Sequence, residues 1–209
     1  LTLSPCEVCA KAIVNAGIDE IIYSEFYAHG KNGIRILNHA GIVVRSDVMS
    51  LIKKLGVLPG LEELLLTTNG AQLEKYSSVL KEAGLSRINI SIDSLDAERF
   101  KRISRVGNLE KVLRGIETAR GVGFDRIRLN SVIMRGYNDD EVIPLAQYAI
   151  DRDIDIAFIE EMPLGEASDH EREDTVCSND WVRRQIEQEY RLVSSAEKTA
   201  GPSRYVQVV

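Results

Sequence analysis

Cys6 and Cys9, three positions apart, are the first residues in this sequence whose type and spacing suit metal binding or redox chemistry. They follow Pro5, which favours the first turn of a helix, and a helix N-terminus stabilises thiolate, the form of cysteine that binds metal or carries out redox reactions. Three interpretations remain open: a zinc site, a redox dithiol, or two small residues on an amphipathic helix. A zinc site would need further ligands besides these two thiols.

Polar side chains on predicted strands form the second group of candidates. Three stretches alternate apolar with polar residues, which is typical of strands with one face on helices and one hydrophilic face. Because helices cover such a parallel sheet, we expect the polar face to line a cavity near the carboxyl ends of the strands. The alternative is a partly exposed face of a truncated sheet. The polar residues of these stretches are Thr67, Asn69, Asn89, Ser91, Asp93, Arg128 and Asn130.

Arg128 is the residue of this group that is hardest to explain as structural. An inward guanidinium needs an anionic partner, because an unpaired buried charge is costly. Alternation also turns Glu160 inward, so Glu160 is the predicted internal partner. It would compete with a bound phosphate for that role.

The elements that position these residues alternate along residues 47–162 with the spacing of βα units. This pattern predicts a parallel sheet covered by helices. Asn138 is the predicted N-cap of the last helix, and the acidic residues after it suit a helix N-terminus. The expected helices are 48–55, 73–83, 108–120 and 139–151, and the expected strands are 61–70, 87–93, 126–134 and 155–162.

Composition excludes several classes of function. The 209 residues include 26 Lys and Arg against 32 Asp and Glu, and a net charge of −6 argues against non-specific nucleic-acid binding. Three cysteines are too few, and odd in number, for a secreted disulfide framework. No apolar run approaches the roughly 18 residues of a membrane span, and no leader opens the chain, so we expect a cytoplasmic protein. The strand-like ends at Leu1 and Val209 predict a fragment or a join of fragments.

Residues 1–43 resemble the C-terminal part of deoxycytidylate and cytidine deaminases. The resemblance rests on TLSPCEVCAKAIVNAGIDEIIYSEFY and the later ILNHAGI. It implies a β-α-β-α segment in which Cys6 and Cys9 hold zinc, the metal that activates water in that family. The His-x-Glu half of the family signature, which supplies the third ligand and the catalytic glutamate, is absent from the sequence.

Residues 44–209 resemble the GTP 3′,8-cyclases, radical S-adenosylmethionine (SAM) enzymes that begin molybdenum-cofactor biosynthesis. The resemblance rests on the ordered motifs VRSDVMSLIKKLGVLPGLEELLLTTNG, INISIDSLDAERFKRIS, GFDRIRLNSVIMRGYNDDE, FIEEMPLGE and GPSRY. It implies an α/β fold, a truncated partial (β/α) barrel with a parallel sheet. It also implies SAM and a [4Fe–4S] cluster as cofactors and GTP or another purine nucleotide as partner. The resemblance also allows the chain to form a homodimer.

The same resemblance implies roles for five residues. Ser91, Met162 and Asn69 would lie at SAM, and Thr67 and Arg128 would bind GTP. The family has Lys where this chain has Arg128, which keeps the charge but replaces a point charge with a planar fork.

Three signatures of the cyclase family are missing from the sequence, and the C-terminal cysteines expected after GPSRY are among them. The other two are the Cys-x3-Cys-x2-Cys loop that holds the cluster and the Gly-Glu-Pro element expected before Val44. We therefore expect three segments, namely the deaminase-like residues 1–43, a radical SAM half-barrel at 44–165 and a C-terminal cyclase extension at 166–209. The predicted function is that of GTP 3′,8-cyclase, with the chain inactive alone. The alternatives are a zinc-dependent deaminase fragment and a non-catalytic nucleotide-binding remnant.

Overall fold

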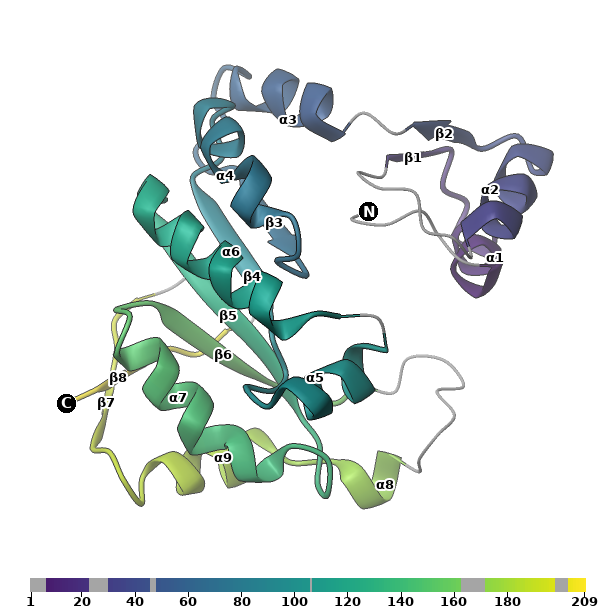
Figure 1. Cartoon of the computed structure of the whole chain (residues 1–209). Coiled ribbons are helices and arrows are strands. Elements are labelled where there is room, and N and C mark those ends of the chain that lie inside the picture. Colours follow the sequence, from purple (N-terminus) through teal and green to yellow (C-terminus); the bar gives the residue numbers. More distant parts are fainter. Residues whose placement is uncertain (1–6, 23–29, 46–47, 106, 163–171, 198–202) are drawn as a thin grey trace. The chain divides into compact units, whose positions relative to one another are not determined.

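A computed structural model describes residues 7–22, 30–45, 48–105, 107–162, 172–197 and 203–209 (Figure 1). The chain divides into two compact units. The first comprises Leu1–Leu65 and Ser78–Ser86, and the second comprises Leu66–Ser77 and Arg87–Val209. Within the described ranges, no helix is long and apolar enough to cross a membrane.

The first unit contains helices and a short parallel pair of strands. Its elements include α1 (Glu7–Asn15), β1 (Glu20–Ile22), α2 (Gly30–His39), β2 (Val43–Arg45) and α3 (Val48–Gly56). Strand β1 pairs in parallel with β2. The helix–strand–helix order agrees with the order predicted for this part of the sequence, whereas the strand predicted at residues 1–4 lies outside the described residues. One buried apolar cluster of this unit consists of Ala10, Ile21, Leu37 and Ile42.

Helix α3 ends where the sequence predicted, at Gly56, and another part of the backbone approaches this residue closely. A Cβ atom at Gly56 would lie 1.9 Å from the carbonyl oxygen of Ala83, and one at Gly84 would lie 3.0 Å from the Cα of Gly56. Only glycine at position 56 lets the two chain segments come this close.

We expect Gly56→Ala to lower the free energy of unfolding by about 1–3 kcal/mol, because the new methyl group must displace backbone rather than a flexible side chain. Gly121→Ala is the matched control, since a Cβ there meets no atom within 4 Å. Alanine in that helical position should stabilise the chain by about 0.5–1 kcal/mol. Urea denaturation of the two variants measures both effects, and equal effects of the two substitutions would contradict the close approach.

The second unit is organised around a sheet with the strand order β3-β4-β5-β6. Strand β4 pairs in parallel with β5, and β5 pairs in parallel with β6. The parallel sheet predicted from the βα spacing is thereby confirmed. The four strands are β3 (Leu65–Thr68), β4 (Arg87–Ser91), β5 (Arg126–Ile133) and β6 (Asp155–Glu160).

Helices cover one face of this sheet. The helices of the chain after β3 are α4 (Leu73–Glu82), α5 (Ala97–Ser104), α6 (Leu109–Val122), α7 (Val142–Ile150), α8 (Arg172–Thr175) and α9 (Asn179–Ile186). Figure 1 shows α6 and α7 lying along the strands. The apolar side chains of the covered strand face are fully buried, as the alternating pattern predicted, and they include Ile88, Ile90, Leu129 and Ile133. Ile116 of α6 and Leu145 of α7 are also fully buried.

Three features of the second unit differ from the prediction or were missed. The helix predicted at 139–151 is a 3-10 turn at Asp139–Glu141 followed by α7, which begins only at Val142. Helices α5 and α9 were not predicted. The strand-like pattern near Val209 corresponds to β8 (Val206–Val208), but β7 (Leu192–Ser194) and its antiparallel pairing with β8 in a C-terminal hairpin were not predicted.

Candidate functional site

The polar face of β4 and β5 is built as the alternation predicted. The register pairs Asn89 with Arg128 and Ser91 with Asn130. Because residues two apart on a strand share a face, these four side chains lie together on the face opposite the buried isoleucines. Ser91 is exposed at the last position of β4, whereas Asn89 is only 4% exposed.

The buried atoms on this face without a hydrogen-bond partner among the described residues include one atom each of Asn89, Arg128 and Asn130. These three atoms are Asn89 Oδ1, Arg128 Nε and Asn130 Oδ1. Buried polar groups are nearly always paired, and each one left unpaired costs about 1–3 kcal/mol. A bound polar ligand or ordered water would supply the missing partners. This deficit distinguishes the polar face from an ordinary exposed strand surface.

The two predicted residues from the β3 region occupy different surroundings. Thr67 Oγ1 accepts a hydrogen bond from Asn89 Nδ2 at 3.3 Å, so Thr67 adjoins the polar face. Asn69 is exposed, and its Oδ1 accepts a hydrogen bond from the backbone N of Ala71 at 3.2 Å. Asn69 therefore shapes the turn after β3, and its contact with SAM stays a prediction.

The predicted pairing of Arg128 with Glu160 is wrong. The register sets Glu160 opposite Ile133, on the helix-covered side, where its Oε1 accepts a hydrogen bond from the backbone N of Asn179 at 2.6 Å. Arg128 Nη1 instead donates to Ser203 Oγ at 3.2 Å and to Tyr205 Oη at 3.3 Å.

Arg126, two residues before Arg128 on β5, pairs with two carboxylates near this face. Arg126 forms ion pairs with Asp155 and with Glu197, and its guanidinium lies 4.9 Å from the ring centre of Tyr205. The hydrogen bond to Asp155 raises the pKa of Arg126 further above its usual range. Arg128 itself forms no ion pair with a carboxylate among the described residues, so its charge is not neutralised there.

A second polar cluster, which the sequence reasoning missed, ties together the carboxyl ends of β4 and β5. Asn138 is fully buried, and its Nδ2 donates to the carbonyl oxygens of Asp93 and Val132 at 2.6 and 2.9 Å. Its Oδ1 accepts from the backbone N of Met134 at 2.8 Å. The prediction that Asn138 caps the following helix is wrong, because its side chain is already used in this bridge.

Glu141 extends this cluster to the loop after β4. It is 6% exposed, and its carboxylate accepts from Ser94 Oγ and from the backbone N of Leu95, each at 2.5 Å. Arg99 of α5 donates to it at 2.8 Å and to Asp140 at 2.5 Å. The hydrogen bond from Arg99 lowers the pKa of the Asp140 carboxyl. The acidic run 139–141 was the sequence signal for this cluster.

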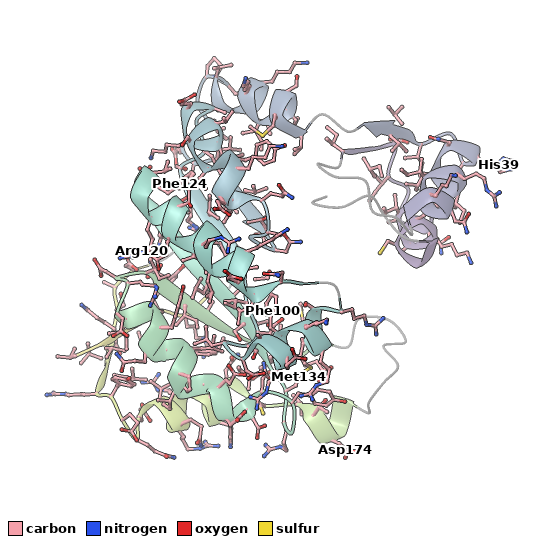
Figure 2. All side chains as sticks on the ribbon, viewed as in Figure 1. His39, Phe100, Arg120, Phe124, Met134 and Asp174 are labelled. Atoms are coloured by element: carbon pink, nitrogen blue, oxygen red, sulfur yellow. The ribbon has the colours of Figure 1, made fainter. Side chains whose placement is uncertain are left out.

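Figure 2 labels two residues that adjoin the cluster, namely Phe100, which follows Arg99 on α5, and Met134, whose backbone N donates to Asn138. Phe100 and Met134 are at the end of the sheet where β5 finishes, and Arg120 and Phe124 are at the end where β5 begins. The cluster therefore joins the end of β5 to the end of β4, where Ser91 is the last residue.

Burial raises the pKa of the Asp93 carboxyl above its usual range, although the hydrogen bond from Val132 N opposes that effect. An acid with a raised pKa binds more protons in the folded state, so stability falls as pH rises from about 4 through the folded pKa. We expect Asp93→Asn to remove this loss.

As pH rises from about 4 through the folded pKa of Asp93, the free energy of unfolding of Asp93→Asn, measured by urea denaturation, should increase relative to that of the wild type. Each tenfold difference in proton affinity between the folded and unfolded states contributes about 1.4 kcal/mol to that increase. A difference between the two proteins that is constant with pH would refute this prediction.

The remaining predicted site residues lie apart from this face or outside the described residues. Met162 is 60% exposed just beyond β6. Cys9 is exposed on α1, and Cys6 lies outside the described residues. Cys177 is buried, which raises the pKa of its thiol. Within the part of the chain that the structure describes, no three His, Cys, Asp or Glu side chains gather as a metal site. Zinc at Cys6 and Cys9 therefore stays a prediction.

Comparison with known families decides the membership of this chain. The model of the radical SAM superfamily matches residues 28–149, which is more than half of the sequence. The chain belongs to the radical SAM superfamily. Its α/β architecture with a parallel sheet fits a truncated barrel of that superfamily.

The chain is similar in sequence to proteins that are named GTP 3′,8-cyclases. The chain is 48% identical over 184 residues to the one from Pseudomonas putida (strain W619), covering 88% of this chain and 55% of that protein. It is 51% identical over 180 residues to the one from Pseudomonas fluorescens (strain Pf0-1), covering 86% and 54%. The chain thus spans about half the length of these relatives. A solved structure of TYW1 with a lysine-pyruvate adduct bound is similar over 85% of this chain and 53% of that chain, with a TM-score of 0.45 and 16% identity.

Radical SAM membership implies SAM and a [4Fe–4S] cluster, but the cysteines of this chain do not fit the cluster. Three thiolates in a Cys-x3-Cys-x2-Cys loop hold it in the family, and no such loop occurs in this sequence. Cys177, which is 1% exposed and far along the chain from the other two, is no substitute. No reaction step is therefore assigned to a cluster held by these residues.

The matched region begins inside the segment that the sequence assigned to a deaminase. Residues 28–43 belong to the radical SAM match, although the resemblance placed the junction near residues 42–45. The three segment boundaries and the deaminase resemblance of the earlier residues stay predictions.

Proposed function

We propose that this chain is part of a GTP 3′,8-cyclase and that the polar face of β4 and β5 binds its purine nucleotide. The identity of about 50% to GTP 3′,8-cyclases over most of the chain supports the reaction class. The observation that carries the binding site is that Asn89, Arg128 and Asn130 each have a buried atom on this face without a hydrogen-bond partner among the described residues. These atoms are one cationic donor and two amide oxygens, which together call for a ligand with both acceptors and donors.

A nucleotide meets this requirement. Its phosphate oxygens accept from the planar guanidinium of Arg128, which suits bidentate contact with an oxyanion. Hydroxyl or amino groups of the nucleotide donate to Asn89 Oδ1 and Asn130 Oδ1. Thr67, whose hydroxyl adjoins Asn89, borders the same site.

We place SAM at the carboxyl edge of the sheet, against Ser91, with Met162 and Asn69 as further contacts. Ser91 is exposed at the end of β4 and adjoins Asn130 in the register, which supports this position. In the superfamily, the cluster cleaves SAM to a 5′-deoxyadenosyl radical. Because this chain lacks the cluster cysteines, we propose that it binds nucleotide but does not turn it over alone.

Equilibrium dialysis of the full chain against GTP, ATP and dCMP tests this proposal. We expect saturable binding of GTP, at least about tenfold tighter than binding of dCMP, because the site is assigned to a purine nucleotide. Preferential binding of dCMP would favour the deaminase interpretation of residues 1–43. Failure to bind any of the three would contradict the proposed site.

Metal analysis of the same preparation separates the interpretations of the cysteines. We expect no iron with acid-labile sulfide, because three thiolates in the family spacing are needed to hold the cluster. Zinc bound at one per chain and lost in Cys9→Ser would support the zinc site at Cys6 and Cys9. Iron with sulfide would contradict the conclusion that these cysteines cannot hold a cluster.

A further inference from the structure

The guanidinium of Arg128 is held on one side by two hydroxyl groups from the end of the chain. Nη1 donates to Ser203 Oγ at 3.2 Å and to Tyr205 Oη at 3.3 Å. These two bonds use both hydrogens of Nη1. The donors that remain at the opposite edge of the guanidinium are Nε and Nη2, and Nε has no partner among the described residues.

The ring of Tyr205 has a contact of its own that does not involve Arg128. Arg126 lies over the ring of Tyr205 and is itself fixed by Asp155 and Glu197. The ring is therefore held by one arginine of β5 while its hydroxyl holds the other. Ser203 and Tyr205 are 75 and 77 residues from Arg128 in the sequence, so this arrangement depends on the C-terminal hairpin returning to the sheet.

We propose that Ser203 and Tyr205 are positioning residues that fix the orientation of Arg128, so that its Nε–Nη2 edge faces an oxyanion of the bound nucleotide. This inference rests on the proposed function. A guanidinium makes two parallel hydrogen bonds to an oxyanion only when its plane is correctly oriented. Holding Nη1 in advance removes the need to order the side chain on binding.

Tyr205→Phe tests the hydroxyl alone, because phenylalanine keeps the ring over Arg126. We expect the affinity of the full chain for GTP to fall about three- to tenfold, as for loss of one ordering hydrogen bond. Affinity for guanosine, which has no phosphate, should not change. Tyr190→Phe is the matched control, because the hydroxyl of Tyr190 donates to Gln147 on another part of the surface. GTP affinity equal to wild type in Tyr205→Phe would overturn the inference.

A double substitution distinguishes orientation of Arg128 from a general effect on packing. A lysine ammonium is a point charge and has no plane to orient. Once Arg128→Lys is present, Tyr205→Phe should therefore change GTP affinity by less than about twofold. A further three- to tenfold loss in that background would contradict a role through Arg128.

The nitrogen NMR spectrum of the arginine side chains gives a test that needs no ligand. Rotation of the Arg128 guanidinium about its Nε–Cζ bond should be faster in Tyr205→Phe than in wild type and unchanged in Tyr190→Phe. An unchanged rate in Tyr205→Phe overturns the inference and leaves the proposed function intact. Absence of GTP binding by the wild-type chain, with the expected NMR change, overturns the proposed function instead.

Discussion

Arg128→Ala is expected to reduce the affinity of the full chain for GTP by about 10- to 150-fold, the largest effect on binding of any single substitution. A hydrogen bond to a charged group contributes about 1.5–3 kcal/mol, which corresponds to that range. The unpaired Nε and the absence of a carboxylate partner among the described residues leave this charge for the ligand. Isothermal titration calorimetry at fixed salt concentration measures the change.

Two further variants make this result specific. Arg183→Ala removes an exposed arginine of α9 that pairs with Glu187, and it should leave GTP affinity unchanged. Arg128→Lys keeps the charge but loses the planar fork, so its affinity should lie between wild type and Arg128→Ala. If Arg128→Ala and Arg183→Ala lowered GTP affinity equally, Arg128 would contribute only through the net charge of the protein.

Asn138→Ala is expected to lower the free energy of unfolding by about 3 kcal/mol. The substitution leaves Met134 N without its acceptor, and it leaves the carbonyl oxygens of Asp93 and Val132 without their side-chain donor. Each buried group that loses its partner costs about 1–3 kcal/mol, and the three costs overlap because they come from one side chain. Denaturation with urea, followed by circular dichroism, measures the loss.

Asn108→Ala provides the matched control for that measurement. Asn108 is an exposed N-cap whose Oδ1 accepts from the backbone N of Lys111 at 2.9 Å. Its replacement should cost about 1 kcal/mol. If the two asparagine variants lost the same stability, the bridge between the ends of β4 and β5 would not have the importance assigned to it.

The strands and their two faces could be predicted from the sequence because the pattern is local. In β5, the residues from Arg126 to Asn130 alternate polar and apolar, and burial alternates along the whole strand, with the polar Ser131 among its buried positions. The apolar positions must be buried whichever neighbours the strand has, so no tertiary information was needed. The end of α3 at Gly56 was found for a similar reason, although the close approach that requires glycine was not.

The partners of the polar residues could not be predicted because they depend on register and on distant segments. Glu160 was assigned to the face of Arg128 by alternation within its own strand, but the register of β6 against β5 sets it opposite Ile133. A shift of one residue moves a side chain to the other face. The hydroxyls of Ser203 and Tyr205 reach Arg128 from the far end of the sequence.

Local propensity also misled the interpretation of Asn138. An asparagine before three acidic residues fits a helix N-cap, and that preference is real for isolated helices. Here, three backbone groups at the ends of β4 and β5 need partners, and the side chain of Asn138 supplies them. Satisfying buried backbone groups outweighs one cap at the surface.

A crystal structure of the full chain with GTP bound tests the central claim most directly. We predict nucleotide on the polar face of β4 and β5, with phosphate oxygen within about 3.2 Å of Arg128 Nε or Nη2 and nucleotide donors at Asn89 Oδ1 and Asn130 Oδ1. Arg128 Nη1 should keep its bonds to Ser203 and Tyr205. Nucleotide bound elsewhere, with these three atoms still unpaired, would contradict the account.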